Sequence, residues 1–122
     1  NIDEWSNVPM DSAEEIVGRF VEPFYFGCEA DDPMNAWAFN TKVNPFGVKL
    51  KAIFSSDIGH WDVPDMRGVV EEVYELLENE LITQNDFREF VFSNTVNLYG
   101  KMNPNFFKGT AVEAQATKIL EK

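Results

Sequence analysis

The chain has 122 residues with 10 basic and 21 acidic side chains, so its net charge is −11 at neutral pH. This length suits one ordinary domain, and a hydrophobic fraction of 44% with 11 phenylalanines excludes a disordered chain. The negative charge argues against nucleic-acid binding, which needs clustered basic residues, and no apolar stretch approaches the length of a membrane span. We therefore expect a globular protein without nucleic-acid or membrane partners.

Helices and strands alternate in the first half of the chain. Asp11 and Ser12 can cap the first helix, and Pro23 ends it. Asp32 can cap the second helix, with Pro33 in its first turn. The predicted elements are a helix over 13–21, a strand over 24–28, a helix over 33–40 and a strand over 50–55.

Helices are predicted throughout the second half. A long helix begins at Pro64 and carries an apolar stripe at three- and four-residue steps, formed by Val69, Val70, Val73, Leu76 and Leu77. Thr83 and Asp86 have the spacing of a capping box at the start of the next helix. Gly100 is expected as the C-cap of that helical region, and 110–122 as a polar helical tail that packs loosely or frays.

The order of elements predicts an α/β fold with parallel strands. Two parallel strands alone do not make a stable sheet, and both segments look buried on two faces. The sequence therefore indicates a piece of a larger sheet, a sheet shared with other copies of the chain, or a sheet with strands that the pattern does not reveal.

The most informative segment is 52–62, where an apolar strand stops at Ser55-Ser56-Asp57 and the loop Gly59-His60-Trp61-Asp62 follows. Side chains at the carboxyl ends of parallel strands converge on one crevice, which is where α/β enzymes place their chemistry. Asp57 is therefore a candidate functional residue. The alternative is an aspartate that only caps the turn after the strand.

The stretch Ser56-Asp57-Ile58-Gly59-His60-Trp61-Asp62, followed by Pro64-Asp65, resembles the last strand of the metal-dependent amidohydrolase superfamily. The resemblance is to the amidohydrolase-related branch, which includes decarboxylases similar to aminocarboxymuconate-semialdehyde decarboxylase. The segment 92–100, with Asn94 and Leu98-Tyr99-Gly100, is similar to the helix that closes that family's fold. The resemblance covers roughly residues 20 to 108.

The resemblance implies a (β/α)8 barrel with one or two metal ions at the carboxyl ends of its strands. It also implies that Asp57 is the metal ligand and catalytic carboxylate of the last strand, with zinc as the expected ion. A carboxylate there suits a divalent metal and can hold the proton of a metal-bound water. The implied reaction is hydrolysis or non-oxidative decarboxylation of a small substrate, and the family suggests a homo-oligomer.

Other residues near Asp57 are weaker candidates. His60 could be catalytic or contact the substrate, or be a partly exposed loop histidine. Trp61 could form a wall of the substrate pocket, or simply pack over the barrel mouth. Glu29, with Asp31 and Asp32, follows the earlier strand and would share the end of the sheet that carries Asp57, unless these acids are only solvated or cap a helix.

The chain departs from the family in ways that limit the activity we expect. His60 is the only histidine, so the His-x-His of the first strand and the two later histidine ligands are missing. A whole barrel needs roughly 250 residues. Residues 1–122 are therefore expected to be a partial barrel domain, comprising the last two βα units and terminal helices. By itself it would be inactive and bind no metal tightly.

A non-enzymatic interpretation also remains open. The chain could be a small acidic α/β module whose aromatic surfaces bind a protein partner. Cys28 stands alone in an apolar aromatic segment, which favours a packing cysteine over a nucleophile and fits a reducing, cytoplasmic setting.

Overall fold

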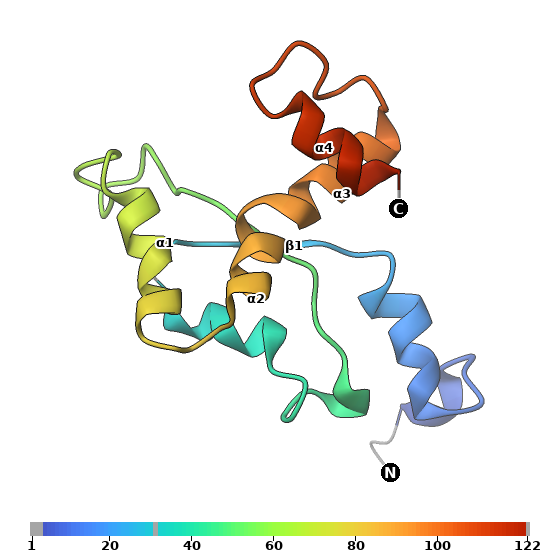
Figure 1. The fold of residues 1–122 in the computed structure, drawn as a ribbon. Coiled ribbons are helices and arrows are strands. Elements are labelled where there is room, and N and C mark those ends of the chain that lie inside the picture. The colour runs from blue at the N-terminus through green and yellow to red at the C-terminus, as the bar shows by residue number, and fades with distance from the viewer. Residues whose placement is uncertain (1–3, 31, 122) are drawn as a thin grey trace.

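The computed structural model describes residues 4–30 and 32–121, and its ribbon is shown in Figure 1. In this part of the chain no helix is long and apolar enough to cross a membrane. The elements in chain order are η1 (Trp5–Asn7), η2 (Ala13–Glu15), η3 (Val17–Val21), β1 (Phe26–Cys28), η4 (Pro33–Phe39), η5 (Pro45–Gly47), β2 (Ala52–Phe54), α1 (Val69–Glu78), α2 (Gln84–Arg88), η6 (Glu89–Ser93), α3 (Asn94–Met102) and α4 (Glu113–Leu120).

The two predicted strands form a parallel pair, which confirms the mixed α/β class. Phe26 lies opposite Ala52, and Cys28 lies opposite Phe54. The connection from β1 to β2 passes through η4, because parallel strands require a crossover rather than a tight turn. In the described part of the chain the sheet consists of β1 and β2 alone.

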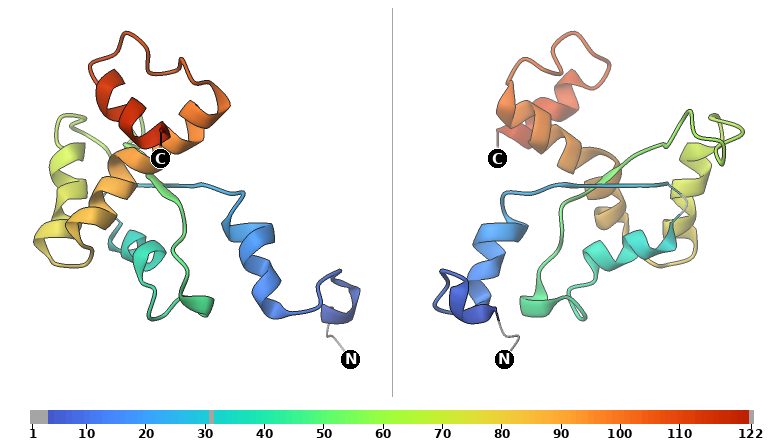
Figure 2. Two further views of the ribbon diagram at one scale, coloured as in Figure 1. Left: turned by 45° about the vertical axis from the view of Figure 1, so that its right-hand side comes forward. Right: turned by 180° about the vertical axis from the view of Figure 1, so that it is seen from behind.

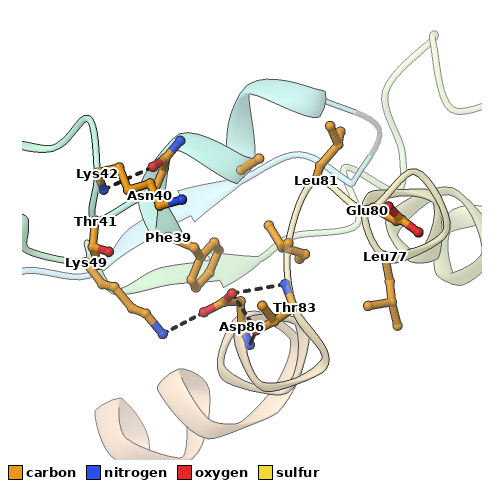
Figure 3. A pocket seen from close by; sticks show the side chains of 12 residues that line it. Phe39, Asn40, Thr41, Lys42, Lys49, Leu77, Glu80, Leu81, Thr83 and Asp86 are labelled. Carbon is orange, nitrogen blue, oxygen red and sulfur yellow. Dashed lines mark hydrogen bonds and ion pairs between the residues drawn. The ribbon is translucent and has the colours of Figure 1, made fainter.

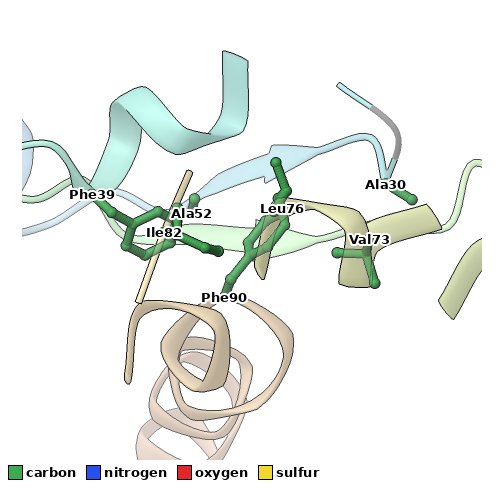
Figure 4. Packing of buried hydrophobic residues seen from close by; sticks show 7 residues of the cluster. All are labelled: Ala30, Phe39, Ala52, Val73, Leu76, Ile82 and Phe90. Atoms are coloured by element: carbon green, nitrogen blue, oxygen red, sulfur yellow. The ribbon is translucent and has the colours of Figure 1, made fainter. Parts of the chain in front are cut away.

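The core lies against one face of this sheet, where Ala52 is fully buried (Figure 4). Phe90 of η6 is also fully buried, with its ring centroid 5.9 Å from Phe39 and 6.2 Å from Phe54. Val73 and Leu76 of α1 complete the cluster together with Ala30 and Ile82. The opposite face carries Gly27 and Ser55, which are exposed, and Ile53, which is half-buried.

In the second half of the chain the helices follow the sequence pattern, except that the first of them, α1, begins later than predicted. Thr83 and Asp86 form the predicted capping box, each side chain bonding the other residue's backbone N–H. The helix expected from Pro64 begins only at Val69, because 57–68 forms successive turns before it. Its stripe is narrower than predicted, since Val70 is exposed.

The predicted C-terminal helix is present as α4, and most of its side chains are exposed. α4 lies on α3, and Ala116 is almost fully buried. Gly100 does not cap α3, which continues to Met102. A Cβ at Gly100 would lie 2.6 Å from Leu120 Cδ1, so a larger residue there would require the Leu120 side chain to move.

The N-terminal segment projects from the rest of the chain (Figure 2). The predicted helix 13–21 is split into η2 and η3, and among the described residues neither element buries a side chain. Phe20 and Phe24 are about half exposed and pack on each other, with ring centroids 5.6 Å apart. The predicted helix 33–40 is also tighter than an α-helix, because η4 is a 3₁₀ helix.

Replacing Phe90 with alanine tests whether this ring holds the helices on the sheet. We expect Phe90→Ala to lower the free energy of unfolding by about 3–5 kcal/mol, because a fully buried phenylalanine leaves a cavity. Denaturant unfolding measures the change. The matched control, Phe24→Ala, removes a half-exposed ring and should cost less than about 1 kcal/mol. Equal losses in the two variants would contradict this core.

Candidate metal centre

Acidic side chains from both strands meet at the carboxyl ends of the sheet. Glu29 follows β1 and Asp57 lies three residues after β2, and both line a cavity of about 50 Å³. Asp62, from the same β2–α1 connection as Asp57, and Glu72 from α1 line the same cavity. Parallel pairing produces this convergence, since it places the carboxyl ends of neighbouring strands at one edge. Four acidic residues around one cavity favour a cation over an anion there.

A tight turn brings Asp57 and His60 into contact. The Nδ1 atom of His60 lies 2.8 Å from Oδ1 of Asp57, and the backbone N–H of His60 donates to the Asp57 carbonyl at 3.2 Å. The turn requires left-handed backbone, with φ of 50° at Asp57 and 105° at Gly59. Aspartate tolerates this conformation better than most residues, and glycine adopts it freely. The turn therefore aims the Asp57 carboxylate at the imidazole.

Asp57, His60 and Asp62 form a group whose candidate ligand atoms all lie within 4.8 Å of one another. Two carboxylates and one imidazole fit zinc and other divalent ions of borderline softness in chemical type. The Asp57 side chain is 19% exposed and that of His60 is 67% exposed, so the group is open to solvent on its histidine side. These residues could hold one divalent cation with positions left for other ligands.

Asp62 and Glu72 were missed by the sequence analysis. The spacing Asp57-x-x-His60-x-Asp62 was visible in the sequence, but it indicates a shared site only once the loop is known to turn back at Gly59. Glu72 lies on a predicted helix, where a solvent-exposed role was the simpler interpretation. Its place in the cavity depends on how α1 packs beside the sheet, which the helix pattern alone does not specify.

The remaining predicted site residues lie as follows. Trp61 is 93% exposed and is not among the residues that line the cavity. Asp32 caps η4, since its carboxylate accepts the Met34 N–H at 2.8 Å. Glu29 lines the cavity, as described above. Asp31 is outside the described residues.

Cys28 packs beside the core, as the sequence analysis expected. Burial raises the pKa of its thiol, and the charge of Asp32 raises it further. The protonated thiol is therefore favoured, whereas a nucleophilic or metal-binding cysteine requires the thiolate.

A second, larger cavity of about 700 Å³ lies at the opposite end of the strands (Figure 3). One of the residues that line it is Lys49, which lies three residues before β2. The Lys49 ammonium lies 2.6 Å from Asp86 and 3.2 Å from Glu89. Asp86 also accepts hydrogen bonds from the hydroxyl and the backbone N–H of Thr83. This network joins the start of α2 to the start of β2, which is a structural role.

Lys49 and Asp86 hold each other in their charged forms. Burial disfavours the charge of Asp86, but hydrogen bonds from Lys49 and Thr83 outweigh it and hold the pKa of the carboxyl below its ordinary value. Burial likewise opposes the charge of Lys49, but hydrogen bonds to Asp86 and Glu89 raise the pKa of its ammonium. The network is therefore present in its charged form across the neutral range.

Comparisons of the sequence with protein-family models and curated proteins, and of the structure with solved structures, gave no match.

The Asp86 network predicts a specific pH dependence of stability. The folded-state pKa of Asp86 lies below the unfolded value of about 4, so its contribution is complete above that value and is lost as pH falls through the folded pKa. We expect the stability difference between wild type and Asp86→Asn to shrink on acidification. Thermal unfolding at several pH values measures this. The control Glu75→Gln removes an exposed charge, and an acid profile shared by both variants would contradict the prediction.

Proposed function

We propose that the chain is the C-terminal part of a metal-dependent, amidohydrolase-like (β/α)8 enzyme, and that Asp57 is a ligand of its divalent cation. The proposal rests chiefly on the contact between the Asp57 carboxylate and His60, with Asp62 in the same group. This group follows the carboxyl end of a parallel strand, where barrel enzymes carry their active sites. Glu29 from the neighbouring strand lines the adjoining cavity, which supports a site shared by successive strands.

The uncovered side of the sheet supports the larger architecture. Parallel sheets are normally covered on both faces, and among the described residues the buried core cluster lies on the face with Ala52 and Phe54. The other face presents Gly27 and Ser55 to solvent. In a closed barrel that face would line the interior and would be filled by side chains from other strands. The exposed face is therefore consistent with a fragment of a closed sheet.

In this proposal each residue has a definite task. Asp57 would bind the cation through one carboxylate oxygen and accept a proton through the other. His60 and Asp62 would bind the cation or hold Asp57 in position. A zinc ion bound there would polarise a substrate oxygen and lower the pKa of a coordinated water. Hydrolysis would use the activated water as its nucleophile. Non-oxidative decarboxylation would use the polarised oxygen to stabilise the charge left when CO2 departs, and a proton would then replace the CO2.

The remaining ligands would come from outside these 122 residues, because the chain has a single histidine. We therefore expect the chain alone to be catalytically inactive and to bind a divalent cation only weakly. Two of the three candidate ligands, His60 and Asp62, are exposed, which weakens their hold on a cation.

A protein-interaction module is the second candidate function. The observation in its favour is the exposed loop after β2, where Trp61 is 93% exposed and Ile58 is 51% exposed. Exposed tryptophans are frequent centres of protein–protein interfaces. In this case the loop would bind a protein partner. Its acidic residues would favour a partner with a basic surface rather than hold a cation.

Zinc titration followed by calorimetry tests the proposed ligand group. We expect weak binding of one zinc ion, and at least a roughly ten-fold loss of affinity in Asp57→Asn or Asp62→Asn, because each removes a charged ligand. The control is Asp65→Asn, which removes a nearby carboxylate that is bound to Arg67 instead. Equal binding by Asp57→Asn and wild type would contradict the assignment of Asp57.

The gene sequence upstream of Asn1 tests the enzymatic assignment separately. An open reading frame that continues upstream and encodes a His-x-His segment after an apolar strand would supply the missing ligands of the proposed barrel. A gene that starts near Asn1 would contradict the barrel and favour the interaction module.

A further inference from the structure

The outer edge of β1 carries backbone groups that do not face β2. The Phe26 N–H donates to the Lys51 carbonyl at 3.0 Å, and the Ser55 N–H donates to the Cys28 carbonyl at 2.8 Å. Phe26 and Cys28 therefore direct their backbone groups toward β2. Because these groups alternate along a strand, the N–H and C=O of Gly27 point toward the other edge.

The two edges of the sheet differ. The edge of β2 is closed at Ala52, whose carbonyl accepts a hydrogen bond of 2.8 Å from the buried amide of Asn94. On the edge of β1, the Asn35 side chain binds the carbonyl of Glu29. The part of the β1 edge without such a hydrogen bond is therefore centred on Gly27, which is exposed. The face of the sheet above Gly27 is also open, since apart from its chain neighbours no atom of the described residues lies within 4 Å of where its Cβ would be.

We infer that this edge pairs with β1 of a second copy of the chain, antiparallel about a two-fold axis at Gly27. Such an axis makes each Gly27 N–H donate to the other Gly27 carbonyl, so both unpaired groups are satisfied at once. Gly27 is exposed, so its outward backbone groups are accessible to a second strand. An open edge without a proline, charge or bulge at its centre is an established route to strand pairing.

Charge complementarity favours a second copy as the occupant. Pairing centred on Gly27 sets Tyr25 of one copy opposite Glu29 of the other, on the same face of the joined sheet. The ammonium of Lys51 lies 4.3 Å from the centre of the Tyr25 ring. The same ammonium donates to the Glu22 carbonyl, which helps to hold it beside Tyr25. Each Glu29 carboxylate would therefore lie across Tyr25 from a cation, and the two-fold axis repeats this arrangement.

The inference concerns the 122-residue chain and does not rest on the proposed enzymatic activity. In a longer protein, a strand that precedes β1 could occupy the same edge within one molecule. Such a protein would lose the dimer and keep cation binding at Asp57, so the failure of one proposal can be distinguished from the failure of the other.

Sedimentation velocity of the 122-residue chain, from micromolar to near-millimolar concentration, tests the pairing. We expect a reversible monomer–dimer equilibrium that strengthens with moderate salt, because salt screens the repulsion between two acidic molecules. Hydrogen exchange of the Gly27 amide should slow as concentration rises. A chain that stays monomeric over the whole range would overturn the inference.

Two sets of variants locate the interface. Gly27→Pro removes an N–H that β2 does not use, and we expect the dimer to weaken by about ten-fold or more, because two hydrogen bonds are lost per dimer. Glu29→Lys and Lys51→Glu should each weaken the dimer, and the double exchange should restore it. Glu78→Lys makes the same change of charge on exposed α1 and should not weaken the dimer.

A dimer insensitive to Gly27→Pro and to both charge reversals would overturn the inference even if the chain self-associates. If Phe20→Ser or Phe24→Ser then abolished the dimer, the interface would lie on the N-terminal segment instead. Circular dichroism of each variant establishes that it remains folded.

Discussion

The parallel pairing of β1 with β2 is the interaction on which the rest of the structure depends. It forces the chain through the η4 crossover and leaves one sheet face for Phe90 and the helices around it. It also places the loop residues at two opposite ends of the sheet. Glu29 and Asp57 come together at the carboxyl ends, whereas Lys49 lies at the amino end.

These two ends differ in their electrostatics. At the amino end, the Lys49 ammonium lies within hydrogen-bonding distance of both Asp86 and Glu89, so each carboxylate has a cationic partner. At the carboxyl end, four carboxylates line one small cavity, and His60 is the basic side chain in contact with Asp57. A divalent cation bound there would balance part of this negative charge. The smaller cavity is therefore the better candidate site for a cation, although the larger one has more room.

The local features of the fold could be predicted from the sequence. The strands, the Thr83–Asp86 capping box and the parallel order follow from residue patterns that act over a few positions. The start of α1 could not be predicted from its pattern, because Pro64 and Asp65 are equally compatible with a turn. The prediction of Gly100 as a cap was wrong, because α3 continues through it to Met102 and Asn103 is the C-cap.

The candidate site was only partly predictable from the sequence. Asp57 was evident from its place after a strand, and His60 from its place in the following turn. Asp62 and Glu72 reach the cavity through the reversal at Gly59 and the packing of α1, which involve contacts distant in sequence. The open edge at Gly27 likewise appears only when the hydrogen bonds of its neighbours are known.

Every part of this account depends on β1 and β2 lying side by side in parallel. Nuclear Overhauser measurements on isotope-labelled protein test that pairing most directly. The account predicts cross-strand contacts between backbone protons of Phe26–Cys28 and those of Ala52–Phe54, in parallel register. An antiparallel pattern, or no contact between the two segments in the folded chain, would contradict the convergence of Glu29 and Asp57 and the cation site that it supports.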